Sequence, residues 1–166
     1  MCTVHQAIDS LYIGNDLAAR REDVLRSIRA THIVTVGAEL QKHFPACFVY
    51  LQIEALDQPS FPLIQYFQGT NEWIEGVLKG GGCVFVHCFE GRSRSATVLC
   101  AYLMFKLGLS AKKALCLLQQ KHPQADPNFG FLYQLGQYEA LLRGEVPVPA
   151  LHSSLENQVN CTCQLS

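Results

Sequence analysis

The sequence has almost no net charge, with 13 Lys and Arg against 14 Asp and Glu in 166 residues. A chain with no excess of one sign has no overall field to attract nucleic acid or an anionic membrane, so we expect no nucleic-acid partner. It also lacks an apolar run of the roughly 18 residues that a membrane-spanning helix needs. The six histidines show no metal-ligand spacing, and we expect no metal or other cofactor.

The first ten residues lack the basic and apolar regions of a secretory signal. This bears on the eight cysteines, a number that would suit disulfides in a secreted protein. Cys83, Cys100 and Cys116 stand among Val, Leu and Ala, where a side chain facing the core is expected, and free cysteine behaves as a small buried hydrophobe. We expect mostly free thiols in a reducing compartment, with the cytoplasm as the main location and the nucleus as a second one.

Strand-like and helix-like segments alternate along the chain. Short β-branched or aromatic runs predict strands at residues 10–14, 32–36, 48–53 and 83–87. Apolar residues at helical spacing predict helices at residues 17–30, 63–79, 95–109, 111–122 and 129–143. The alternation predicts an α/β fold, with a central, mostly parallel sheet of about five strands flanked by helices.

The character of the sequence changes at Gly144. We expect one folded domain over residues 1–143 and a disordered tail over 144–166, which has two prolines, little charge and no periodicity. The last four residues, from Cys163 to Ser166, fit a prenylation motif, and Cys161 could carry a second lipid. Two lipids would give stable membrane association. A chance match in a cysteine-rich tail is the alternative.

The stretch HCFEGRSRS, residues 87–95, joins a predicted buried strand to a predicted helix. Backbone N–H groups at such a junction, together with the helix dipole, attract anions. Gly91 lets several N–H groups turn toward one centre, and Arg94 offers a planar fork for two phosphate oxygens. Cys88 lies in this electropositive ring, which favours a thiolate that can attack phosphorus. The alternative, a buried Cys with a surface Arg, needs a chance match on the order of one in ten thousand.

These residues resemble the signature of the cysteine-dependent protein tyrosine phosphatases, in their small dual-specificity branch. That pattern is His-Cys, five residues, Arg, then Ser or Thr, as in HCFEGRSRS. The segments LYIGN, THIVTV, LDQPSFPLIQYF, AYLMFK and DPNFGFLYQLGQYE add to the resemblance, in the family's order. The pairing of VLRSIRATHIVTV with FVYLQIEALD looks most like plant enzymes that act on MAP kinases.

The resemblance implies a role for each catalytic residue. Cys88 is the expected nucleophile, and Arg94 is expected to bind the phosphate. Asp57 is expected to protonate the leaving oxygen and later to deprotonate water; its alternative is a turn residue before a proline, with Glu54 as the fallback acid. Ser95 is expected to hydrogen-bond the thiolate and help it leave.

Further positions of the loop are expected to contact the substrate or to order the loop. His87 is expected to order the loop without acting as a general base, and Asn128 either braces the loop or caps the last helix. The expected substrate-binding positions are His87, Phe89, Glu90, Gly91, Arg92, Ser93 and Arg94.

Three functions stay open at this point. The leading one is hydrolysis of phosphotyrosine and of phosphoserine or phosphothreonine in proteins, with a MAP kinase as a candidate substrate. The second is a phosphatase for phosphoinositides or another non-protein ester, which is suggested by Arg92 because its charge should favour a substrate with extra negative charge. Glu90 should disfavour such a substrate. The third is a phospho-binding module without turnover, which would not need a nucleophile.

Overall fold

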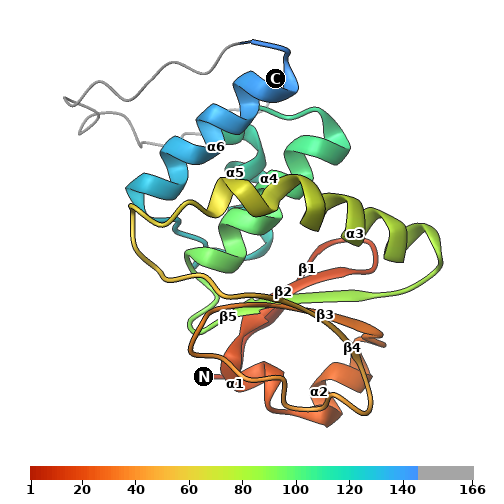
Figure 1. The fold of residues 1–166 in the computed structure, drawn as a ribbon. Helices are drawn as coiled ribbons and strands as arrows, with labels where there is room; N and C mark the ends of the chain where they lie inside the picture. Colours follow the sequence, from red (N-terminus) through yellow and green to blue (C-terminus); the bar gives the residue numbers. More distant parts are fainter. Residues whose placement is uncertain (146–166) are drawn as a thin grey trace.

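The computed structural model describes residues 1–145, and the segment that carries Cys161 and Cys163 lies outside the described residues. The described chain forms a five-stranded sheet with helices on both faces (Figure 1). The strand order is β1-β2-β5-β3-β4. The bounds are Val4–Ile8 for β1, Leu11–Asn15 for β2, His32–Val36 for β3, Val49–Ile53 for β4 and Val84–Cys88 for β5.

The four strands expected from the sequence are confirmed, and so is the mostly parallel sheet. Strands β2, β5, β3 and β4 run parallel to one another. Every residue of β5 is buried, because this strand lies between β2 and β3 and has helices over both faces. The carboxyl end of β5 therefore lies between the carboxyl ends of its two parallel neighbours, β2 and β3.

The sequence did not reveal β1, which pairs with β2 in antiparallel fashion. It lies at the edge of the sheet, and its register shifts between Gln6 and Ile8. Ala7 is its one fully buried residue. An edge strand with so little buried surface shows only a weak hydrophobic pattern, and this explains why the sequence failed to predict it.

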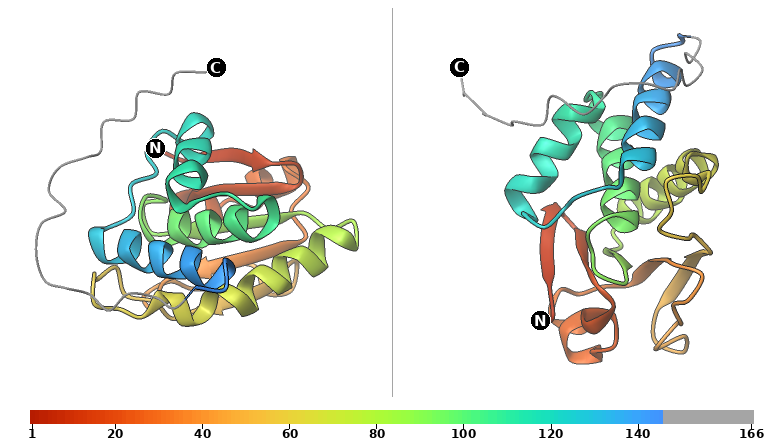
Figure 2. Two further views of the ribbon diagram at one scale, coloured as in Figure 1. Left: turned by 90° about the horizontal axis from the view of Figure 1, so that it is seen from above. Right: turned by 90° about the vertical axis from the view of Figure 1, so that its left-hand side faces the viewer.

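The helices divide unequally between the two faces of the sheet (Figures 1 and 2). One face carries the 3₁₀ helix η1 (Leu63–Tyr66) and the helices α3 (Phe67–Lys79), α4 (Arg94–Leu107), α5 (Ala111–Lys121) and α6 (Phe129–Leu142). The other face carries α1 (Asp16–Ala19) and α2 (Glu22–Ser27). Residues 94–104 of α4 are all buried. In the described residues no helix combines the length and the apolar character needed to cross a membrane.

The single helix predicted over residues 17–30 is wrong, because two short helices occupy this segment. Arg21 is extended, with φ −114° and ψ 100°. Its N–H donates to the Ala18 carbonyl at 3.0 Å, which closes α1 with a tight turn. Side-chain pairs then form within each part, Arg20 with Asp16 and Arg21 with Asp23. Local bonds of this kind compete with the continuous helix that the apolar spacing predicts.

A charged contact joins α3 to α4, the helix that follows the loop at residues 89–93. Glu75 accepts hydrogen bonds from Lys106 at 2.7 Å and from the buried Tyr102 hydroxyl at 2.8 Å. The bonds from Lys106 and Tyr102 lower the pKa of Glu75 to about 2. The carboxylate therefore stabilises the fold only while it is ionised.

We expect Glu75→Gln to lower the stability at neutral pH by about 1 kcal/mol, or roughly 3 °C in Tm. The folded pKa of Glu75 is below its ordinary value of 4.5, so its contribution is present above 4.5 and is lost as the pH falls through about 2. Thermal unfolding of both proteins across this pH range should show the difference in Tm disappear in acid. Glu72→Gln is the matched control, since Glu72 lies on the same helix and bonds only Gln68 at the surface. An equal, pH-independent loss in both variants would contradict the assignment.

Candidate active site

The loop that joins β5 to α4 holds the predicted nucleophile. β5 ends at Cys88 and α4 begins at Arg94, so the loop lies at the carboxyl edge of parallel strands and at a helix N-terminus. Cys88 is 1% exposed. Its Sγ lies 3.1 Å from the Oγ of the buried Ser95. The structure thus brings together two residues that the sequence assigned to one reaction.

Gly91 sets the path of this loop. Its φ is +74°, a left-handed conformation that side chains rarely adopt. A Cβ at this position would lie 2.7 Å from the carbonyl oxygen of Gly14, at the end of β2. The N–H of Asp16 also donates to the Phe89 carbonyl at 3.1 Å. The loop is therefore packed directly against the start of α1.

Arg94 lies at the base of the loop and is 5% exposed. Its NH1 is 2.7 Å from Oε1 and 2.9 Å from Oε2 of Glu39, and it donates to the Ala55 carbonyl at 3.2 Å. Its Nε is buried without a hydrogen-bond partner among the described residues, and lies 3.8 Å from Oδ2 of Asp57. A buried donor with no partner is costly unless a ligand satisfies it. This position suits an anion.

Asp57 projects over the loop from the segment after β4, as its local sequence context suggested. Its Oδ1 accepts hydrogen bonds from the Ser93 hydroxyl at 2.7 Å and from Nδ2 of Asn128 at 2.9 Å. Asn128 also caps α6 by accepting from the Phe131 N–H at 2.9 Å, which confirms the capping interpretation, and its backbone N–H donates to the Ser93 hydroxyl of the loop at 3.1 Å. With Oδ1 occupied, Oδ2 is the oxygen of Asp57 that can carry a proton. The fallback residue, Glu54, is exposed.

His87 is fully buried behind the loop. Its Nε2 lies 2.9 Å from the Thr35 hydroxyl on β3, and its ring stacks on Phe85 with centroids 5.6 Å apart. Burial lowers the pKa of His87 to about 4, so the imidazole is neutral at physiological pH. A neutral, enclosed ring fits the expectation that His87 orders the loop and does no general-base work.

The outer side of the loop is exposed and carries two charges of opposite sign. Phe89 is 56% exposed, and Glu90 and Arg92 are exposed as well. The Arg92 guanidinium donates to Asp126 at 2.8 Å, and the Arg92 carbonyl accepts from the Asp126 N–H at 2.9 Å. Asp126 therefore pairs with Arg92 through both side chain and backbone, a contact that no sequence pattern predicted.

Residues 11–140 match the model of the family described as dual specificity phosphatase, catalytic domain. This chain belongs to the dual specificity phosphatase family. It is 41% identical over 134 residues to dual specificity protein phosphatase 1B of Arabidopsis thaliana, which covers 81% of this chain and 80% of the relative. It is also 41% identical over 129 residues to dual specificity protein phosphatase 1 of the same plant, which covers 78% of this chain and 65% of the relative.

A solved structure agrees with the sequence comparisons. The crystal structure of human DUSP28 has a TM-score of 0.81 and 33% sequence identity, and the match covers 84% of this chain and 95% of that one. The chain is therefore a dual specificity protein phosphatase, a hydrolase with the fold of its family.

Two histidines that sequence reasoning left unassigned lie behind the loop of the phosphatase. His122 is fully buried, and its Nε2 is 2.6 Å from the carbonyl oxygen of Gly91. Its Nδ1 is 2.6 Å from Nδ1 of His5 on β1. A carbonyl can only accept, so Nε2 of His122 carries the proton and donates. When His122 is neutral, its Nδ1 must accept from His5. Residues separated by 117 positions are joined here, which no local pattern could indicate.

The pKa of His122 indicates that this arrangement holds near neutral pH. Burial lowers the pKa of His122, the bond to Gly91 opposes the shift, and the neighbouring His5 adds to it. The neutral form therefore dominates at physiological pH. His122 is thus placed to hold the Gly91 carbonyl away from the anion site.

We expect His122→Ala to raise KM for a small aryl phosphate and Ki for inorganic phosphate by about fivefold, the effect of one lost hydrogen bond. The effect on kcat should be smaller, because His122 touches no reacting atom. His122→Gln should restore part of the affinity, since it keeps an N–H donor of similar reach. His32→Ala is the control, because His32 packs on Trp73 and not on the loop. Equal losses in the Ala and Gln variants would indicate a merely structural role.

Proposed function

We propose that this phosphatase hydrolyses phosphotyrosine and phosphoserine or phosphothreonine in proteins through a cysteinyl-phosphate on Cys88. The observation that supports this is the meeting of three groups at one loop. The Cys88 sulfur bonds Ser95 at 3.1 Å at the bottom of the loop, and the free Nε of Arg94 faces Asp57 at 3.8 Å. A nucleophile, an anion-binding fork and a proton donor are the parts that this reaction needs.

In the first step the Cys88 thiolate attacks phosphorus while the phosphate is held by the loop N–H groups and by Arg94. A sulfur–phosphorus bond forms and the bond from phosphorus to the substrate oxygen breaks. Asp57 enters this step protonated and gives its proton to the leaving oxygen, so that an alcohol or phenol departs rather than an alkoxide or phenoxide. The helix N-terminus of α4 stabilises the negative charge throughout.

In the second step the Asp57 carboxylate takes a proton from water, and the water oxygen attacks phosphorus. The sulfur–phosphorus bond breaks, inorganic phosphate leaves, and Cys88 returns as a thiolate. The Ser95 hydroxyl stabilises this leaving thiolate by donating to it. Asp57 is then protonated again, so the cycle consumes one water and needs no further co-reactant.

Proteins are the substrate class that the loop charges favour. A phosphoinositide headgroup carries several phosphates, and Arg92 was the residue that could have attracted them. In the structure Arg92 is bound to Asp126, whereas the Glu90 carboxylate is exposed beside the loop. This balance disfavours a polyanionic ligand. A MAP kinase is the specific candidate, and it rests on the resemblance to plant enzymes and on no contact in the structure.

A phospho-binding module without turnover is the weaker alternative. Binding alone could use Arg94 and the loop N–H groups. It would not require a thiol held against a hydroxyl, nor a carboxylate fixed above it by Ser93 and Asn128. The presence of these further groups supports an enzyme.

We expect Cys88→Ser to lose turnover altogether while it still binds phosphopeptides, because a serine hydroxyl in this loop stays protonated. Release of inorganic phosphate and peptide binding by calorimetry measure the two properties separately. Residual turnover well above the uncatalysed rate would exclude the covalent route. The binding-competent variant can also be used to capture substrates from a cell lysate, with a doubly phosphorylated MAP kinase loop as the first candidate.

We expect Asp57→Asn to slow substrates with poor leaving groups, such as phosphoserine peptides, by about 100-fold or more, and activated aryl phosphates far less. The difference arises because an activated phenol leaves without a proton. Initial rates across a series of leaving-group pKa values measure this dependence. Glu54→Gln is the matched control and should keep the wild-type dependence. An equal slowing of all substrates by Asp57→Asn would move the acid role to another residue.

A further inference from the structure

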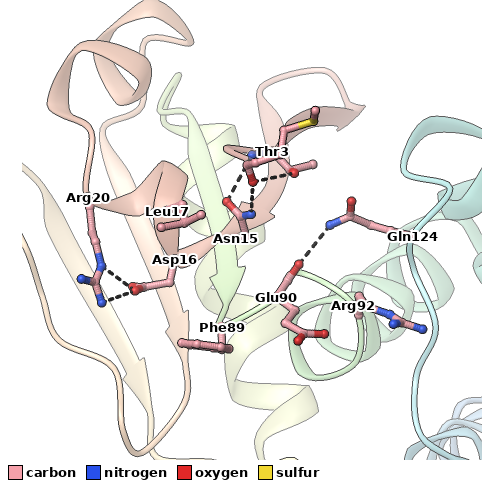
Figure 3. A pocket seen from close by; sticks show the side chains of 10 residues that line it. Thr3, Asn15, Asp16, Leu17, Arg20, Phe89, Glu90, Arg92 and Gln124 are labelled. Atoms are coloured by element: carbon pink, nitrogen blue, oxygen red, sulfur yellow. Dashed lines mark hydrogen bonds and ion pairs between the residues drawn. The ribbon is translucent and has the colours of Figure 1, made fainter.

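A second recess lies beside the phosphate loop, between the loop and α1. It is a pocket of about 610 Å³ whose lining includes Asn15, Asp16, Leu17, Phe89, Glu90 and Arg92 (Figure 3). We call it the Glu90 pocket. The Asp16 N–H bond to the Phe89 carbonyl ties its two walls together. The reaction described above uses none of the side chains that line it.

Nearly all polar side chains of the Glu90 pocket already have partners within the protein. Asp16 is bound by Arg20 at 2.7 Å and by His43 at 3.0 Å. Asn15 accepts from the N–H groups of Thr3 and Ala18 at 3.1 Å each. These pairs cancel one another's charge or use up their hydrogen-bonding groups.

The other wall of the Glu90 pocket follows the same rule with one exception. Gln124 donates to the Glu90 backbone carbonyl at 3.0 Å, and Arg92 is paired with Asp126. The Glu90 carboxylate has no hydrogen bond and no ion pair with any residue in 1–145. Among the charged side chains of the lining, Glu90 is the one without such a partner in residues 1–145; the Met1 ammonium, a backbone charge, also lines the pocket.

The remaining walls of the Glu90 pocket are apolar. Phe89 is 56% exposed and Leu17 is 51% exposed, although both are large hydrophobic side chains. Figure 3 shows Glu90 between Phe89 and Arg92, with the Arg92 guanidinium pointing away from the Phe89 ring. An exposed aromatic face beside a free carboxylate suits a side chain with an apolar stem and a cationic head.

We propose that the Glu90 pocket binds a lysine or arginine side chain of the substrate protein, within two residues of the phosphorylated residue. This rests on the proposed function. The aliphatic stem would lie on Phe89 and Leu17, and the cationic head would pair with Glu90. Glu90 is two positions from Cys88, so its Cα lies within about 7 Å of the Cα of Cys88. A substrate residue one or two positions from the phosphorylated one spans the same distance.

The test compares phosphotyrosine peptides of an alanine-rich host, with Lys, Ala or Glu at each of the two positions on either side. We expect lysine to exceed alanine in kcat/KM by about three- to fivefold in at least one position, as an exposed ion pair allows. In Glu90→Gln this ratio should fall to about one, and in Glu90→Lys glutamate should become the preferred residue. Each rate is divided by that variant's rate on a small aryl phosphate, so a general loss of activity cancels.

Glu145→Gln is the matched control, since it removes an exposed carboxylate just beyond α6 and should keep the lysine ratio. In the unaltered enzyme, raising the ionic strength should lower the ratio of kcat/KM for lysine over alanine, because salt screens an exposed ion pair. A ratio near one at all positions, or one that Glu90→Gln leaves intact, would overturn the basic-residue site while aryl phosphate hydrolysis proceeds. Absence of aryl phosphate hydrolysis in the wild-type enzyme would instead remove the proposed function, and this inference with it.

Discussion

The turn from β5 into α4 is the constraint on which the rest of the structure depends. Within seven residues the chain ends a fully buried strand, takes a left-handed conformation at Gly91 and begins a buried helix at Arg94. At a helix N-terminus the first N–H groups have no partner within the helix, and an anion or a thiolate can accept hydrogen bonds from them and interact favourably with the helix dipole. The Cys88 thiol, 1% exposed and bonded to Ser95, lies where that negative charge is best stabilised.

Other parts of the fold hold this turn in its conformation. A Cβ at Gly91 would lie 2.7 Å from the Gly14 carbonyl oxygen, so the close approach of the loop to β2 leaves no room for a larger residue at position 91. His122 bonds the Gly91 carbonyl from behind, and Asp126 bonds the backbone of Arg92. The loop is therefore held in place by residues that take no part in the proposed reaction. Preorganisation of this kind matters because the N–H groups must face the phosphate before it arrives.

The charges around the loop are distributed so that few remain uncompensated. Glu39 pairs with one nitrogen of Arg94 and leaves its Nε to the anion site. Asp126 pairs with Arg92 at the surface. Glu90 is left as a free carboxylate on the outer wall. In the proposed reaction the anion site binds one phosphate, and the exposed Glu90 carboxylate beside it fits the proposed preference for a single phosphorylated side chain next to a basic residue.

The candidate reaction centre could be predicted from the sequence, because HCFEGRSRS places strand end, glycine, arginine and hydroxyl within nine residues, and local spacing alone implies their meeting. Through the resemblance the sequence also indicated Asp57 and Asn128, whose side chains bond each other at 2.9 Å. The tertiary structure alone decided the break after α1, the edge strand β1, and the partners Glu39, His5 and Asp126. These depend on which strands are neighbours and on contacts between distant segments, which no short pattern encodes. The local charge around Glu90 and Arg92 could not be predicted from these two residues alone, because Asp126, 34 positions after Arg92, pairs with Arg92.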